Sequence, residues 1–77
     1  MRRVIVKWID AAGECDSNTA EAIAAFPNWE FTTLGFLVFE DKEVVRVSQS
    51  HLVCGDEDEY KFTMTIPKGT IRSMKDI

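Results

Sequence analysis

The sequence has few of the residues from which metal sites, disulfide frameworks and catalytic centres are built. Its 77 residues include only two cysteines and one histidine. Zinc ribbons require two close pairs of ligands and small secreted scaffolds require several disulfides, so two cysteines far apart in the chain favour neither. We expect Cys15 and Cys54 to be free thiols in a reducing compartment.

Long apolar runs are also missing, and so is an excess of positive charge. No stretch approaches the roughly 18 apolar residues of a membrane-spanning helix, and residues 1–7 reach charged side chains too early for a secretory signal peptide. The chain has 9 Lys and Arg against 13 Asp and Glu, and its net charge of −4 repels polyphosphates. We therefore expect a cytoplasmic protein with no membrane partner, and nucleic acid is disfavoured as a partner.

What is present is the composition of a small folded domain. Hydrophobic residues make up 45% and charged residues 29% of the chain, which is ordinary for a globular protein. Residues 1–77 are enough for a single domain with one core. A domain of this size buries only about 60% of the surface that its unfolded chain exposes, so self-association often supplements its stability. We therefore expect a homo-oligomer.

Two segments in the first half of the chain have the period-two pattern of strands. Residues 3–9 alternate β-branched and aromatic side chains. Residues 29–39 form the second segment, and its C-terminal half is apolar on both faces, as in a strand that is sandwiched, strongly bent or part of an oligomer contact. Gly35 marks the expected bend, because a missing side chain permits a kink or the close approach of another backbone.

The long connection between these two strands, residues 10–28, favours one or two helical turns. Asn18 is placed to be the N-cap, and Glu21 would close a capping box with it. Such a short helix is not stable alone, so we expect Ile23 and Phe26 to pack on the sheet.

The second half of the chain predicts a hairpin followed by two more strands. In chain order it contains a charged turn at 40–43, a strand at 44–50, a polar loop with the acidic run 56–59, a strand at 60–66, a turn at 67–70 and a short last strand within 71–77. The strand at 60–66 alternates cleanly, so Tyr60, Phe62, Met64 and Ile66 are expected to be buried. This order predicts an all-β fold, a small five-stranded bent-sheet barrel of the SH3-like or Sm-like kind, whose long first loop holds a short helix.

Two resemblances to known families accompany this pattern. Residues 60–74, and above all Ile66-Pro67-Lys68-Gly69-Thr70-Ile71, resemble the end of Sm-like barrels, where a strand, a single turn and a last strand complete the fold. A larger part of the chain resembles a class of small uncharacterised bacteriophage proteins, through residues 6–11, 33–37, 40–41, 47–50 and 66–68. The first resemblance implies a ring that binds RNA. The second implies a phage origin, and hence a bacterial host, without implying an activity or any site residues.

The single histidine lies close to a cysteine in His51-Leu52-Val53-Cys54, with Asp56 nearby and Cys15 in another loop. These are the residue types of a zinc site or of a Cys–His nucleophilic pair. The spacing is unspecific, however, and no orienting group or oxyanion-hole turn accompanies it. A histidine at the edge of a loop and two packed thiols are favoured, so we expect no metal, no cofactor and no enzymatic activity.

Two charge patterns permit more than one interpretation. The run Asp56-Glu57-Asp58-Glu59 lacks the alternating ligand spacing of a calcium loop, so a solvated loop is favoured over recognition of a basic partner. Basic residues lie in or beside most of the expected strands. If Arg46 and Arg72 shared one rim, the barrel would bind a single nucleic-acid strand or a nucleotide phosphate. The overall acidity instead favours dispersed, solubilising charge.

The apolar residues of the second strand supply the candidate contact surface. Trp8 is expected in the core, whereas Trp29 suits the core and an exposed contact equally well. With the two arginines, the candidate contact residues are Trp29, Leu34, Phe36, Val38, Arg46 and Arg72. The leading hypothesis is a non-enzymatic, self-associating interaction module that binds a protein partner, such as a host protein. The alternatives are an oligomeric binder that sequesters a small ligand or nucleotide, and an Sm-like RNA-binding ring.

Overall fold

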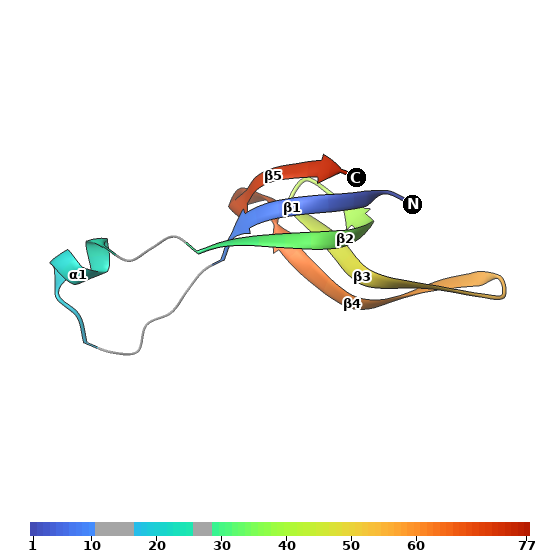
Figure 1. The fold of residues 1–77 in the computed structure, drawn as a ribbon, viewed down its shortest axis with the longest axis horizontal. Helices are drawn as coiled ribbons and strands as arrows, with labels where there is room; N and C mark the ends of the chain where they lie inside the picture. The colour runs from blue at the N-terminus through green and yellow to red at the C-terminus, as the bar shows by residue number, and fades with distance from the viewer. Residues whose placement is uncertain (11–16, 26–28) are drawn as a thin grey trace.

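The alternating segments of the chain form strands that pair with their neighbours in antiparallel fashion (Figure 1). The computed structural model describes residues 1–10, 17–25 and 29–77. Its elements in chain order are β1 Arg3–Ile9, α1 Ala20–Ala24, β2 Glu30–Glu40, β3 Val44–Cys54, β4 Glu57–Pro67, the 3₁₀ turn η1 Lys68–Thr70 and β5 Ile71–Asp76. The predicted small all-β fold is thereby confirmed.

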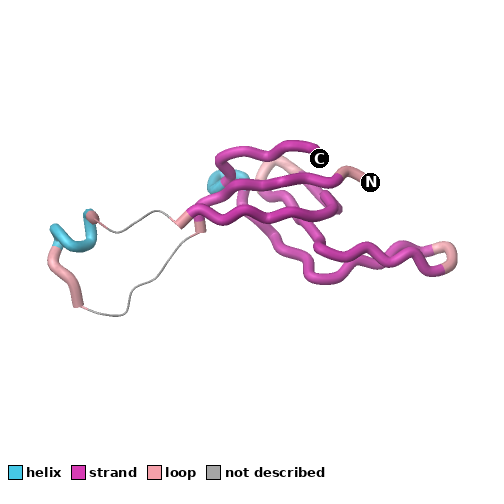
Figure 2. Tube along the Cα trace, viewed as in Figure 1, coloured by secondary structure: helices cyan, strands magenta, loops and turns pink. Residues whose placement is uncertain are grey.

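The five strands make one curled sheet in the order β4-β3-β2-β1-β5 (Figure 2). The central strand, β2, changes partner along its length, because residues 30–36 pair with β1 and residues 36–40 pair with β3. Phe36 belongs to both ladders, opposite Arg3 on one side and Ser48 on the other. Within the described residues no ladder joins β4 to β5, so the sheet curls toward a barrel without closing.

The core lies on the inner face of the curl and is built from aliphatic side chains of three strands. Val4 and Val6 of β1, Val45 and Val47 of β3, and Ile66 of β4 are fully buried. The period-two geometry of a strand accounts for this pattern, since every second residue points inward. The larger side chains that pack against this group remain partly exposed; they are Trp8, Leu37, Ile71 and Met74.

The backbone of β3 comes very close to β2 at Gly35. A Cβ atom at this position would collide with the carbonyl oxygen of Ser48 and would lie only 2.8 Å from Val47 Cγ1. The carbonyl belongs to the backbone, so it cannot rotate away. Of the two features that a missing side chain permits, the close approach of another backbone is the one observed at Gly35, where β2 and β3 cross with only hydrogen between them.

Only the last of the four residues expected to be buried in β4 is buried. Ile66 is inaccessible and Tyr60 is half-buried, whereas Met64 is 41% and Phe62 is 74% exposed. The expectation fails because β4 is an edge strand. At Tyr60 and Phe62, β4 lies beside a part of β3 that has left β2, so no third strand of the described chain is next to them, whereas Met64 is at the edge of the sheet opposite Val47.

Both strands of the β3–β4 hairpin are longer than the sequence predicts. The turn between them consists of Gly55, with a φ of 64°, and Asp56, whereas residues 57–59 belong to β4. The prediction of a polar loop carrying the whole acidic run is therefore wrong. Acidic side chains have low strand propensity, and this conceals the start of β4 in the sequence pattern.

Phe62 has a backbone conformation that is rare for a residue with a bulky side chain. Its φ of 58° lies in the left-handed region. This conformation costs a residue with a Cβ atom roughly 1–2 kcal/mol. Phe62 stands at a gap in the β3–β4 ladder, between the pairs Ser48↔Thr63 and Ser50↔Lys61.

The short helix forms, but with a different cap and a different environment from those expected. The hydroxyl of Thr19, not the side chain of Asn18, caps the helix by accepting a hydrogen bond of 3.1 Å from the Ala22 N–H. Ile23 is 53% exposed, so its expected burial against the sheet is wrong. Phe26 lies outside the described residues.

Asp41 fixes the turn between β2 and β3. Its Oδ1 atom accepts hydrogen bonds of 2.8 Å from the backbone N–H groups of Val44 and Glu43. These two donors stabilise the charged carboxylate, and they lower the pKa of Asp41 below its ordinary value.

We predict that Gly35→Ala destabilises the protein by about 1–3 kcal/mol, the usual result of forcing extra atoms into a packed site. Gly69→Ala is the matched control, because a Cβ atom there would meet nothing within 4 Å. Its effect should stay within about 0.5 kcal/mol. Urea unfolding followed by tryptophan fluorescence measures both. Equal effects of the two substitutions would contradict the crossing at Gly35.

The stability that Asp41 contributes depends on pH. The lowered pKa of Asp41 means that its contribution to stability is present above the ordinary carboxyl pKa and is lost as the pH falls through the lowered value. Asp41→Asn retains an acceptor oxygen but not the charge. The wild type should therefore be more stable than Asp41→Asn at neutral pH, and the difference in their urea midpoints should disappear in acid. A gap that is independent of pH would show that the charge of Asp41 does not matter.

Candidate functional site

The outer face of β2, β1 and β5 combines positive charge with exposed apolar groups. Because Val4 and Val6 point inward, their neighbours on β1 point outward. The register places Ile5 between Leu34 and Lys75, and places Lys7 beside Thr32 and Ser73. We call the outward group of Arg3, Ile5, Lys7, Leu34 and Lys75 the basic face. Three of its members are cations, and Leu34 is 52% exposed.

The apolar candidates of β2 occupy different surroundings. Leu34 belongs to the basic face, whereas Phe36 is half-buried and meets the His51 ring edge-on, with ring centroids 5.6 Å apart. Val38 is 38% exposed and sits in the irregular pairing between Leu37 and Phe39. Trp29 precedes β2 and is 56% exposed, so of its two expected environments the exposed one is observed.

The two candidate arginines do not meet on neighbouring strands. Arg46 lies on β3 and Arg72 on β5, and the sheet order puts β2 and β1 between these strands. The guanidinium of Arg46 lies 4.9 Å from the centre of the Phe39 ring, and its Nε donates to Thr65 Oγ1 at 3.3 Å. Positive charge gathers instead at the cations of the basic face, a grouping that the sequence pattern does not predict because it depends on the register of three strands.

The second surface is a two-stranded extension of the sheet. The β2–β3 ladder stops at Phe36↔Ser48, but β3 and β4 stay paired as far as Cys54↔Glu57 and run together past the other strands (Figure 1). We call residues 50–61 the arm. At its base His51 stacks on Tyr60 with ring centroids 4.9 Å apart.

The same histidine faces a carboxylate. His51 Nε2 is buried and lies 3.3 Å from Asp58 Oδ2, in a contact that lacks the geometry of a hydrogen bond and becomes an ion pair when the imidazole is protonated. This position places His51 inside an aromatic group rather than at a loop edge. The arrangement holds the two strands of the arm together at its base.

Sequence reasoning missed the exposed apolar residues on and beside the arm. Leu52 is 47%, Val53 is 68% and Phe62 is 74% exposed. The sequence pattern predicts a loop for the first two and the core for the third. The signal that was available is the run from Val44 to Val53, which contains four valines and neither glycine nor proline.

The structure gives no support for a metal centre in the part of the chain it describes. Among these residues no group of three His, Cys, Asp or Glu side chains is arranged to hold an ion. Cys15 lies outside the described residues, so the grouping of His51 with both cysteines stays untested.

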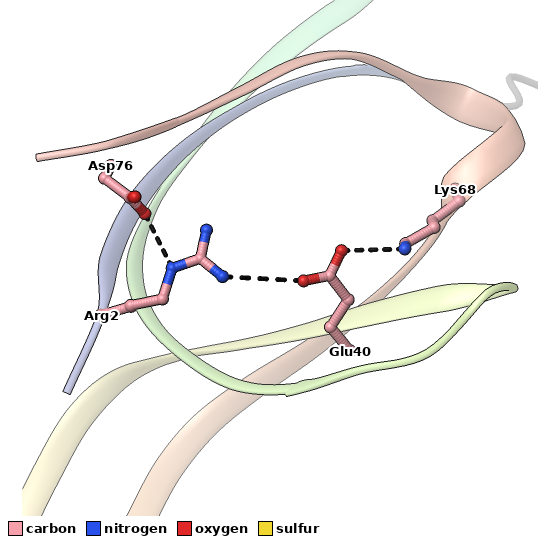
Figure 3. Close-up of polar contacts among 4 residues, drawn as sticks. All are labelled: Arg2, Glu40, Lys68 and Asp76. Atoms are coloured by element: carbon pink, nitrogen blue, oxygen red, sulfur yellow. Dashed lines mark hydrogen bonds and ion pairs between the residues drawn. The ribbon is translucent and has the colours of Figure 1, made fainter.

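A network of charged side chains joins both ends of the chain to the end of β2 and to η1 (Figure 3). Arg2 Nε donates to Asp76 Oδ1 at 2.9 Å, and its Nη1 lies 3.8 Å from Glu40 Oε1. Glu40 Oε2 in turn accepts from Lys68 Nζ at 2.8 Å. Figure 3 shows the four side chains reaching toward one another from the N-terminus, β2, η1 and β5. Because all of these charges are matched, we interpret the network as a structural clasp.

Comparison of the chain with protein-family models, with curated proteins and with solved structures gives no match. Among the described residues, no helix has both the length and the apolar character needed to cross a membrane.

We predict that Glu40→Gln weakens the clasp. Its members are partly exposed, and ion pairs of this kind contribute up to about 1 kcal/mol. The loss should therefore be no more than about 1 kcal/mol at low salt and should shrink at high salt. Urea unfolding at two salt concentrations measures it. Glu43→Gln is the control, because Glu43 has no ion-pair partner among the described residues. A loss that does not respond to salt would contradict the electrostatic interpretation.

Proposed function

We propose that this protein is a non-enzymatic interaction module that acts as a homo-oligomer in the cytoplasm. The observation that carries the proposal is the distribution of its apolar side chains. In the described residues the fully buried core consists of five aliphatic side chains, whereas large apolar side chains of β2, β3 and β4 are exposed. Monomeric proteins rarely expose large apolar patches, so exposed apolar side chains that share a surface usually mark a contact with another molecule.

A second copy of the chain is the first partner to consider. A small domain with a thin, open sheet gains the burial that it lacks by association. The partly exposed residues around the core, including Trp8 and Met74, show that the curl alone does not complete that burial. The resemblance to small bacteriophage proteins supports a host protein as a further partner of the assembled module.

Sedimentation velocity and native mass spectrometry of the purified protein test the proposal directly. We expect a mass above that of the monomer, with a population that depends on concentration. Leu34→Asp places a charge on the exposed apolar centre of the basic face and should shift the population toward the monomer, with at least a tenfold weaker association. Ile23→Asp is the matched control, since Ile23 is equally exposed but lies on α1.

A monomer at every accessible concentration would overturn the proposal. The same mass spectra distinguish the other functions considered for a barrel of this size. A mass increase from a molecule that stays bound through purification would indicate a small-ligand binder. An increase in the mass of the protein on adding a single-stranded RNA at low salt would indicate a nucleic-acid binder.

A further inference from the structure

The arm is built in a way that leaves it incomplete in a single copy. An isolated two-stranded ribbon is at best marginally stable in water, and three strands or a packed face are normally needed. The His51–Tyr60 stack steadies the base of the arm. Toward the tip, Leu52 and Val53 are exposed on opposite faces of the ribbon. The tip therefore presents apolar side chains that the described chain does not cover.

Phe62 adds an aromatic ring at the root of the arm. The left-handed conformation found there is easily adopted by glycine and tolerated by asparagine, and it is unfavourable for phenylalanine. If only the backbone conformation mattered at this position, glycine or asparagine would be more favourable than phenylalanine. The ring is also 74% exposed, so it does not stabilise the core. An external contact accounts for both features.

The arm is also negatively charged where its apolar residues are exposed. Leu52 is paired with Glu59, and Glu57 lies two residues before Glu59 on the same side of the ribbon. Neither glutamate has an ion-pair partner among the described residues. Lys61, nearer the base, is the one cation of the arm.

The basic face has the complementary character. Arg3, Lys7 and Lys75 are exposed and have no ion-pair partners in the described part of the chain. Leu34 provides an exposed apolar group on the neighbouring strand β2, opposite Ile5. Each of the two surfaces thus carries an excess of unmatched charge of one sign beside an exposed apolar group, although Lys61 on the arm and Glu30 at the end of β2 have the opposite sign.

We propose that the arm of one copy docks on the basic face of a second copy, with Leu52 against Leu34, with the glutamates against the lysines, and with Phe62 as a further contact at the root of the arm. This inference rests on the proposed self-association and names the surfaces that produce it. The contact joins unlike surfaces, so each copy has two contacts to make, one with its arm and one with its basic face; two copies that exchange arms close a dimer, and a contact with two different neighbours builds a ring or a filament.

Charge reversal provides the sharpest test. Lys7→Glu with Lys75→Glu gives the face variant, and Glu57→Lys with Glu59→Lys gives the arm variant. Each variant alone opposes like charges, so its self-association should weaken at least tenfold in sedimentation velocity at low salt. A mixture of the two variants restores opposite charges at the contact between unlike copies and should associate more tightly than either variant alone. Lys42→Glu, at the exposed β2–β3 turn, is the control for a change in net charge.

Phe62 gives an independent readout. Phe62→Gly and Phe62→Asn relieve the unfavourable backbone conformation, so the urea midpoint of the dissociated protein should stay equal to that of the wild type or rise. Self-association should nevertheless fall at least tenfold. A loss of association without a loss of folding separates a contact residue from a structural one.

The outcomes are distinct from those of the proposed function. A wild-type monomer would remove both proposals. A wild-type oligomer that is unchanged by the face, arm and Phe62 variants would leave self-association in place and overturn the arm contact. An assembly weakened in both charge variants but not strengthened in their mixture would also overturn it, since the two surfaces would then not face each other.

Discussion

The close crossing of β2 and β3 at Gly35 is the constraint on which the rest of the structure depends. With only a hydrogen atom at this position, the Ser48 carbonyl can lie against β2, and Phe36 can pair with β1 and β3 together. The crossing gives β2 two different neighbours in its two halves. It thereby sets both the curl that buries the valines of β1 and β3 and the point at which β3 leaves β2.

The same crossing explains where the two candidate surfaces lie. Because β3 leaves β2 after Ser48, the N-terminal half of β2 continues with β1 alone and its outward residues remain accessible on the basic face. β3 continues with β4 alone and becomes the arm. One change of partner along β2 therefore produces a face without a covering layer and a ribbon without a third strand, as far as the described residues extend.

The five strands could be predicted from the sequence because their signal is local. The pattern of residues 3–9 matches β1 at both ends, and Gly35 was recognisable because a glycine inside an apolar strand usually marks a kink or a close backbone approach. The environment of Phe62 could not be predicted in this way. Alternation states which residues share a face, whereas burial depends on whether another strand covers that face, which is a property of the whole sheet. The acidic residues 57–59 concealed a strand for a related reason, since pairing with β3 overrides their weak propensity.

The distribution of charges separates structure from contact. Where the two termini lie close to the end of β2 and to η1, four charged side chains neutralise one another: Arg2, Glu40, Lys68 and Asp76. A network with matched charges stabilises the chain that contains it. The basic face and the two glutamates of the arm have no such partners among the described residues. Since unlike charges at a distance attract only weakly through water, these groups contribute little to the fold of one copy. Brought together around apolar side chains that exclude water, the same charges would select one orientation of the neighbour and reject others, which is the contribution that electrostatic complementarity makes to an interface.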